Sequence, residues 1–247
     1  MFEGIVDVFT ADLAFVAAVA IVSGIVHGYT GFGAALVMVP LLALLYGPVE
    51  AIAVTSIAGL IGSAQVYPGA ARIALWRVVG PLTLAIIIAT PLGVVVLISV
   101  DPEWIRRAIG VFVLMAALLI MSGWVYRGRR GVAASVVTGA LCGVVSGVAG
   151  VGGPPVVVYF IAAPEAIEVQ RANIVISVGV VLVLVLGSMA VGGAVDSGTA
   201  ARGVVAAPFY MAGFWGGSRL FVTAPQILYR KVALWRLIAT GLSAVVF

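Results

Sequence analysis

The segment VSGIVHGYTGFGAA, residues 22–35, places glycine, histidine, tyrosine and threonine inside a long apolar stretch. The segment LCGVVSGVAGVGGP, residues 141–154, repeats the same spacing of glycines 119 positions later. The aligned pairs are Gly24 and Gly143, Gly28 and Gly147, Gly31 and Gly150, and Gly33 and Gly152. Because glycine tolerates backbone conformations that end a helix, each segment predicts a helix interrupted where its surroundings are most apolar.

The composition around these segments predicts a helical membrane protein. Of the 247 residues, 64% are hydrophobic and 9% are charged, which is more apolar surface than a soluble domain buries. Uncharged runs such as Val78–Val100, Ala108–Tyr126 and Ala172–Val195 exceed the roughly 18 residues that cross hydrocarbon as a helix. Apolar and polar residues do not alternate along these runs, so they do not fit the strands of an outer-membrane barrel.

The charges and the single cysteine exclude several other classes of protein. The basic residues behind the net charge of +4 lie in short loops, where they set membrane orientation, so no nucleic-acid partner is expected. Cys142 stands alone, which excludes an internal disulfide and a cysteine-based metal site. The sequence contains no Walker motif, which excludes ATP drive within this chain. No cofactor, metal ligand or catalytic residue is predicted.

The chain is predicted to form one membrane transport domain, residues 1–247, built from two repeats. EAIAV at 50–54 resembles EAIEV at 165–169, and DPEWIRR at 101–107 resembles APQILYRK at 224–231. These similarities follow the glycine segments in the same order, which indicates an internal duplication. The repeats cover residues about 12–126 and about 132–247.

The interrupted segment of each repeat has two interpretations. Its first piece, about 12–27 in the first repeat, reaches about 24 Å at 1.5 Å per residue, and its second, about 34–46, reaches about 20 Å. Neither piece alone crosses about 30 Å of hydrocarbon. The two pieces therefore stack as one long interrupted helix or fold back as a re-entrant hairpin.

The distribution of basic residues favours the hairpin. It places ten of the 13 Lys and Arg residues on one side and leaves Arg106, Arg107 and Arg202 on the other, as the positive-inside rule predicts. The predicted fold is an all-α integral membrane protein with two inverted repeats, each a re-entrant or broken-helix hairpin plus three transmembrane helices. The N- and C-termini are predicted outside, on the side that is poor in basic residues.

The helix breaks predict a binding site for a small ion. Irregular backbone within hydrocarbon is tolerated only where protein or a water-filled cavity covers it. A helix N-terminus at a break offers free N–H groups and partial positive charge to an anion. Two breaks that face each other near the membrane midplane are typical of secondary transporters with inverted repeats. No acidic residue lies in either break, so the sequence predicts a small anionic substrate. The alternative is that these glycines only allow close helix packing.

Polar side chains near the breaks complete the candidate site. His27 could donate to an oxyanion or carry a proton, or it could stay neutral and bond a carbonyl that the break leaves free. Arg171 is a substrate contact or a cytoplasmic anchor, and Gln65 lines the path or lies at the lipid interface. The predicted substrate-binding set is His27, Gly28, Tyr29, Thr30, Gly31, Gly33, Thr55, Gln65, Ser146, Gly147, Gly150, Gly152, Gly153, Arg171 and Asn173.

The sequence resembles the TauE/SafE family, also called the 4-toluene sulfonate uptake permease family. The matching features are GYTGFGAALVMVPLL at 28–42 and SGVAGVGGPPVVVYFI at 146–161, and the resemblance covers essentially the whole chain. It implies ATP-independent transport of sulfite or organosulfonates such as sulfoacetate, commonly as export, across the bacterial inner membrane. The first break departs from the family pattern, because Ala34 and Ala35 stand where glycine is frequent.

Other functions stay open at this point. A protein that conducts protons or cations is the transport alternative, and an intramembrane serine hydrolase that pairs Ser146 with His27 is the enzymatic one. The expected partners are the lipid bilayer and the small anion, and a homodimer is neither required nor excluded. Alternating access of one midplane site to the two sides is the predicted mechanism.

Overall fold

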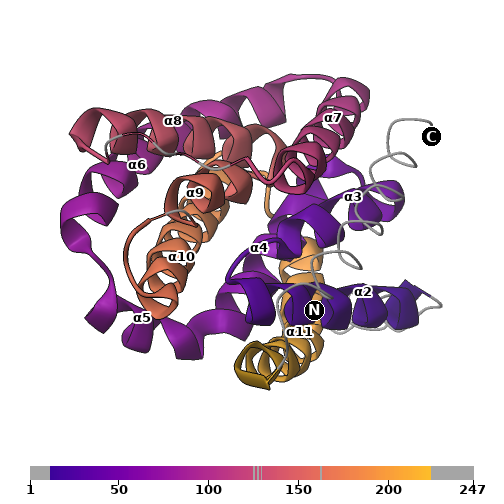
Figure 1. Cartoon of the computed structure of the whole chain (residues 1–247). Coiled ribbons are helices and arrows are strands. Elements are labelled where there is room, and N and C mark those ends of the chain that lie inside the picture. The colour runs from indigo at the N-terminus through magenta and orange to yellow at the C-terminus, as the bar shows by residue number, and fades with distance from the viewer. Residues whose placement is uncertain (1–11, 125, 127, 129, 162, 224–247) are drawn as a thin grey trace.

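The computed structural model describes residues 12–124, 126, 128, 130–161 and 163–223, and every element within these ranges is a helix (Figure 1). Five helical segments are long and apolar enough to cross a membrane. They are Leu13–Thr30, Pro48–Ile73, Trp76–Ser99, Val132–Ala149 and Ile167–Val191. The protein is therefore an all-α, multi-pass membrane protein, as its composition predicts.

The described helices follow the order of the two predicted repeats. The first half contains α2 (Asp12–Thr30), α3 (Ala34–Tyr46), α4 (Pro48–Ser63), η2 (Ala64–Val66), α5 (Tyr67–Ile73), α6 (Trp76–Ser99) and α7 (Pro102–Met121). The second half contains α8 (Val132–Ala149), α9 (Gly153–Phe160), α10 (Ile167–Val191) and α11 (Ser197–Thr223). The starts of α3 and α4 recur 119 residues later as the starts of α9 and α10. The span predicted at 231–247 lies outside the described residues.

The chain reverses direction at the break between α8 and α9. The Tyr159 hydroxyl near the end of α9 lies 2.9 Å from the Ser135 hydroxyl near the start of α8. Arg130, just before α8, donates from Nε to the carbonyl of Tyr159 over 3.1 Å. In the first half, one buried cluster unites Val16 near the start of α2 with Leu42 near the end of α3. The pieces therefore lie side by side as hairpins and do not stack as one long helix.

The first piece of each hairpin is longer than the sequence predicts. α2 contains 19 residues and α8 contains 18, so each reaches about 27–28 Å at 1.5 Å per residue. Both qualify by length and apolarity as membrane spans. The prediction that the first piece ends near residue 27 was too short, because His27, Gly28, Tyr29 and Thr30 continue the last turn of α2.

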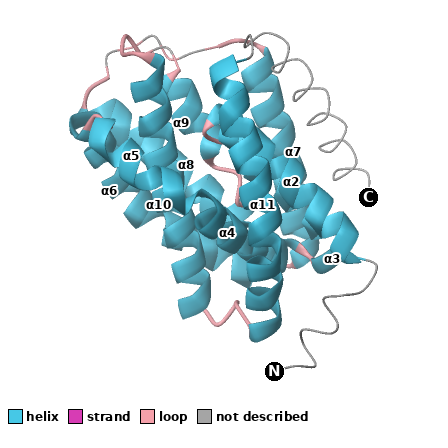
Figure 2. Ribbon diagram, turned by 90° about the horizontal axis from the view of Figure 1, so that it is seen from below, coloured by secondary structure: helices cyan, strands magenta, loops and turns pink. Residues whose placement is uncertain are grey.

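The two halves exchange their first helices. α2 packs along α11, and α8 packs along α6, as Figures 1 and 2 both show. Small residues permit this close approach: a Cβ atom added at Gly28 would collide with the backbone of Phe214, and one added at Gly147 would collide with the backbone of Thr90. These two glycines, which were predicted to bind substrate, therefore serve helix packing.

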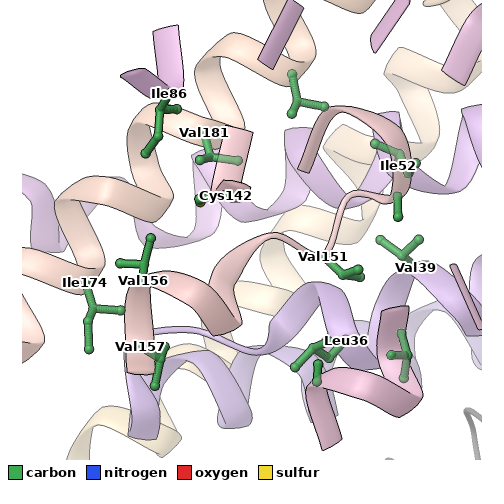
Figure 3. Packing of buried hydrophobic residues seen from close by; sticks show 14 of the residues in the cluster. Leu36, Val39, Ile52, Ile86, Cys142, Val151, Val156, Val157, Ile174 and Val181 are labelled. Atoms are coloured by element: carbon green, nitrogen blue, oxygen red, sulfur yellow. The ribbon is translucent and has the colours of Figure 1, made fainter. Parts of the chain in front are cut away.

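A buried apolar cluster surrounds the second break (Figure 3). It joins Leu36 and Val39 of α3 and Ile52 of α4 to Val151, which lies in the break itself. The hairpin of the second half is thus anchored in helices of the first half. This packing brings the two breaks to one place in the fold.

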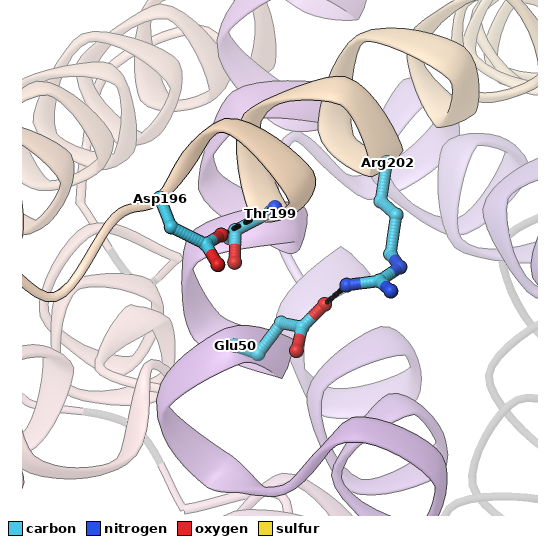
Figure 4. A network of polar contacts seen from close by, with 4 residues as sticks. All are labelled: Glu50, Asp196, Thr199 and Arg202. Carbon is cyan, nitrogen blue, oxygen red and sulfur yellow. Dashed lines mark hydrogen bonds and ion pairs between the residues drawn. The ribbon is translucent and has the colours of Figure 1, made fainter. Parts of the chain in front are cut away.

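Ionic contacts join helix starts at one end of the bundle. Arg202 near the start of α11 pairs with Glu50 in the first turn of α4 (Figure 4), and its guanidinium lies 4.9 Å from the ring centroid of Tyr46. Asp196 accepts a hydrogen bond of 2.7 Å from the backbone N–H of Thr199 and so caps α11. The hydrogen bonds from Thr199 hold the pKa of the Asp196 carboxyl below its usual value.

Candidate functional site

Each break is formed by glycine in the left-handed conformation. Gly31 and Gly33 of the first break (residues 31–33) have φ of 81° and 88°, and Gly150 of the second break (residues 150–152) has φ of 71°. The N–H of Gly31 still reaches the carbonyl of His27 over 2.7 Å, which closes α2. Since L side chains rarely adopt this backbone conformation, glycine at these positions ends the helices as the sequence predicts.

One pocket lies between the two breaks. Residues of both breaks line it, together with the first turns of α3 and α9 and parts of α2, α4, α8, α10 and α11. About 530 Å³ of empty space lies in and around it, a volume that includes open solvent at its edge. The prediction that the two breaks come together is therefore confirmed by the geometry.

Seven of the predicted substrate-binding residues line this pocket: His27, Gly33, Thr55, Ser146, Gly150, Gly152 and Gly153. The polar side chains among them are buried, with exposed fractions of 2% for His27, 3% for Thr55 and 0% for Ser146. Each comes from a different helix, α2, α4 and α8. The pocket therefore gathers polar groups that are far apart in the sequence.

His27 and Thr55 carry unused hydrogen-bonding capacity into the pocket. The Nδ1 atom of His27 lies 2.5 Å from the hydroxyl oxygen of Tyr210 on α11. Its Nε2 atom and the Thr55 hydroxyl have no partner among the residues that the structure describes. Buried polar atoms normally find a partner, so these two groups are available for a hydrogen bond to a polar ligand.

The serine and the histidine of the predicted dyad do not contact each other. Ser146 Oγ lies 3.9 Å from Cys142 Sγ, whereas His27 is engaged with Tyr210. The alternative prediction, a neutral His27 that bonds a carbonyl freed by the break, is not met at Nδ1, which contacts Tyr210, and stays a prediction for the side of the ring near Gly31. Tyr210 is a pocket-lining residue that the sequence pattern missed, because it is 183 residues from His27 and lies in an ordinary apolar helix.

The two helix N-termini at the pocket differ in their supply of donors. The first N–H groups of a helix lack partners inside it, and neither cap residue, Gly33 or Gly152, adds a side-chain bond. In α3 these groups belong to Ala34, Ala35 and Leu36, which line the pocket. In α9 the corresponding turn contains Pro154 and Pro155, which have no N–H to offer. The first break therefore offers more backbone N–H donors to the pocket than the second break does.

The other predicted site residues lie outside the pocket lining. Arg171 donates to the carbonyl of Gly28 over 2.6 Å, and Asn173 accepts from the N–H of Leu75 over 2.8 Å. The Thr30 hydroxyl donates a hydrogen bond of 2.8 Å to the main-chain carbonyl of Val26. The remaining four are Tyr29, Gly31, Gln65 and Gly147. Gln65 is exposed in η2, and Gly31 packs on Arg171 and Val175.

A sequence model of the family described as "Sulfite exporter TauE/SafE" matches residues 16–244 of this chain. The match includes both breaks and every residue named above as lining the pocket. The chain matches none of the curated proteins and none of the solved structures with which it was compared.

Proposed function

Because the chain belongs to the TauE/SafE sulfite exporter family, we propose that it is a secondary transporter of sulfite or an organosulfonate such as sulfoacetate, bound in the pocket between its two helix breaks. The family itself implies a membrane transporter of a sulfur anion. The single observation that carries the proposed site is the pair of buried, unpartnered groups, His27 Nε2 and Thr55 Oγ1, between two broken helices.

The chemistry of the pocket favours an anion. Its lining contains no Asp, Glu, Lys or Arg side chain among the described residues, so recognition falls to neutral donors and the N-terminus of α3. A cation site would recruit carboxylate oxygens, which argues against the proton- or cation-conducting alternative. Oxygens of a sulfur oxyanion accept several hydrogen bonds at once, which matches the supply of donors.

The transport mechanism that we propose is alternating access between two inverted halves. The exchange of first helices, α2 onto α11 and α8 onto α6, is reciprocal, as expected for halves related by a pseudo-two-fold axis. Arg106 contacts the carbonyl of Ala43, and Arg202 contacts Glu50, so both reach the end of the bundle at which α3 ends and α4 starts. This grouping agrees with the predicted placement of Arg106 and Arg202 on the same side of the membrane, which we propose is the outer side.

Flux into proteoliposomes tests this proposal. We expect uptake of sulfite or sulfoacetate above that of empty liposomes, and a comparison with and without a pH gradient reports proton coupling. Thr55→Val removes one unpartnered hydroxyl from the pocket, whereas Thr83→Val removes an unpartnered hydroxyl of α6 that does not line it. The first change should raise KM and the second should not. Absence of flux for every sulfur oxyanion, or equal effects of the two changes, would contradict the proposal.

A further inference from the structure

His27 is held by two aromatic side chains of α11. Its Nδ1 atom lies 2.5 Å from Tyr210 Oη, and its ring meets the ring of Phe214 edge to face, with centroids 5.2 Å apart. Tyr210 and Phe214 are both buried, with 1% of each exposed. The imidazole therefore has one defined orientation, with Nδ1 toward α11 and Nε2 unpartnered at the pocket.

The contact with Tyr210 decides which ring nitrogen carries the hydrogen. A phenol hydroxyl has one hydrogen to donate, and within the described part of the chain His27 Nδ1 is its one hydrogen-bonding partner. If Nδ1 carried a hydrogen, the buried tyrosine hydrogen would lose its acceptor, which is unfavourable. The tyrosine therefore donates to Nδ1, and a neutral imidazole with an accepting Nδ1 carries its hydrogen on Nε2.

We propose that Tyr210 is a positioning residue whose hydroxyl donates to Nδ1 of His27 and thereby presents the Nε2 hydrogen to one oxygen of a sulfur oxyanion in the pocket. This inference rests on the proposed function and refines it, since the histidine then recognises substrate as a neutral N–H donor. Binding completes the hydrogen bond that Nε2 lacks in the protein alone.

The second half of the chain provides an internal comparison. Ser146 occupies the position equivalent to His27, 119 residues later. The carbonyl of Tyr210 faces Gly24 on α2, and the carbonyl of Ile86 faces Gly143 on α8, so Ile86 is the counterpart of Tyr210. A serine hydroxyl rotates to suit its acceptor and needs no partner to fix a tautomer, whereas histidine does. The histidine and the tyrosine therefore occur together in the α2–α11 pair, and the serine and the isoleucine occur together in the α8–α6 pair.

The tautomer can be measured directly, because His27 is the single histidine of the sequence. Protein labelled with nitrogen-15 histidine, purified without a histidine tag and reconstituted into liposomes gives solid-state NMR signals from this residue alone. We expect the hydrogen on Nε2, and we expect sulfoacetate to shift the Nε2 signal far more than the Nδ1 signal. In Tyr210→Phe both tautomers should be populated. A hydrogen on Nδ1 or a doubly protonated ring in the wild-type protein would overturn the inference.

Transport kinetics separate positioning from a merely structural role. Tyr210→Phe should raise KM about fivefold to tenfold and change kcat less than about twofold, as the loss of one oriented donor predicts. The matched control is Tyr159→Phe, which removes another buried hydroxyl, bonded to Ser135 over 2.9 Å, and should leave KM unchanged. In a His27→Gln background, Tyr210→Phe should have no further effect on KM. If Tyr210→Phe raised KM by the same factor in the His27→Gln background, or left KM unchanged on its own, the positioning role would be refuted.

The NMR measurement and the transport kinetics together distinguish a failure of this inference from a failure of the proposed function. Wild-type liposomes that transport no sulfur oxyanion refute the proposed function, and the NMR response to sulfoacetate then decides the inference by itself. Wild-type transport together with a silent Nε2 signal or an unaffected Tyr210→Phe variant refutes the inference alone.

Discussion

Arg171 donates from Nη2 to the main-chain carbonyl of Gly28 over 2.6 Å. Gly28 lies in the last turn of α2, where carbonyls lack partners within the helix, and a cation there also complements the helix dipole. Ile52 takes the corresponding place at the second break, where its Cγ1 atom would lie 3.0 Å from a Cβ added at Gly150. The first break is therefore held by a charged hydrogen bond and the second by apolar packing.

Loss of the Arg171 contact should loosen the first hairpin. A hydrogen bond to a charged group contributes about 1.5–3 kcal/mol, so Arg171→Gln should lower Tm in detergent by about 3–10 °C. Arg72→Gln is the matched control, because Arg72 is exposed in α5. Equal Tm values for the two variants would show that the carbonyl of Gly28 does not depend on Arg171.

The ion pair between Glu50 and Arg202 should couple more strongly than the pair between Glu103 and Arg107. The side chains of the first pair are 23% and 31% exposed, and those of the second are 72% and 62% exposed. Solvent screening reduces the coupling energy of an exposed ion pair within one helix to about 0.3 kcal/mol. For the more buried pair we expect a coupling energy of about 1 kcal/mol. Double-mutant cycles with Gln at both positions, read out as unfolding free energy, measure each coupling. A coupling at Glu103–Arg107 that matches or exceeds the other would contradict this ranking.

Backbone donors of α3 should bind the anion. Ala35 is equivalent to Pro154, 119 residues later, so the fold accepts proline at this position of the hairpin. Ala35→Pro removes one pocket-lining N–H and should raise KM for sulfite or sulfoacetate about tenfold, the value of one hydrogen bond to a charged group.

The control for this change is Ile167→Pro. It removes an N–H from the first turn of α10, which does not line the pocket there, and Ala166 before it already has the extended backbone that precedes proline (ψ 149°). Its KM should equal that of the wild-type protein. A wild-type KM in Ala35→Pro would instead remove α3 from the site.

Cys142 should report occupancy of the pocket. It is the single cysteine, it is 1% exposed, and it lines the pocket beside Ser146. Sulfoacetate at ten times its Kd should slow maleimide labelling of Cys142 about tenfold, since only the free protein reacts. In a Cys142→Ser background, a cysteine at the exposed position of Ser122 should be labelled at one rate with and without sulfoacetate. Equal protection at both positions would mean that sulfoacetate acts on the reagent rather than on the pocket.

Several features were readable from sequence because their causes are local. The mean apolarity of a run determines whether it crosses a membrane, and glycine at Gly31 and Gly150 permits the φ angles that end α2 and α8. The loss of two N–H donors at Pro154 and Pro155 is equally readable from residue chemistry, because proline has no backbone N–H. Similarity between short segments was a less reliable guide to structurally equivalent positions. EAIAV and EAIEV are 115 positions apart, whereas the starts of α4 and α10 are 119 positions apart.

The sequence by itself determined an all-helical membrane protein with two repeated helix breaks, because spans and breaks depend on residues close together in the chain. Only the tertiary structure decided which groups form the site. Gly28 and Gly31 belong to one motif, yet one meets the backbone of Phe214 on α11 and the other meets α10. Tyr210 reaches His27 across 183 residues. Such contacts depend on how each helix is rotated against a partner from the other half of the chain, and no local pattern encodes that rotation.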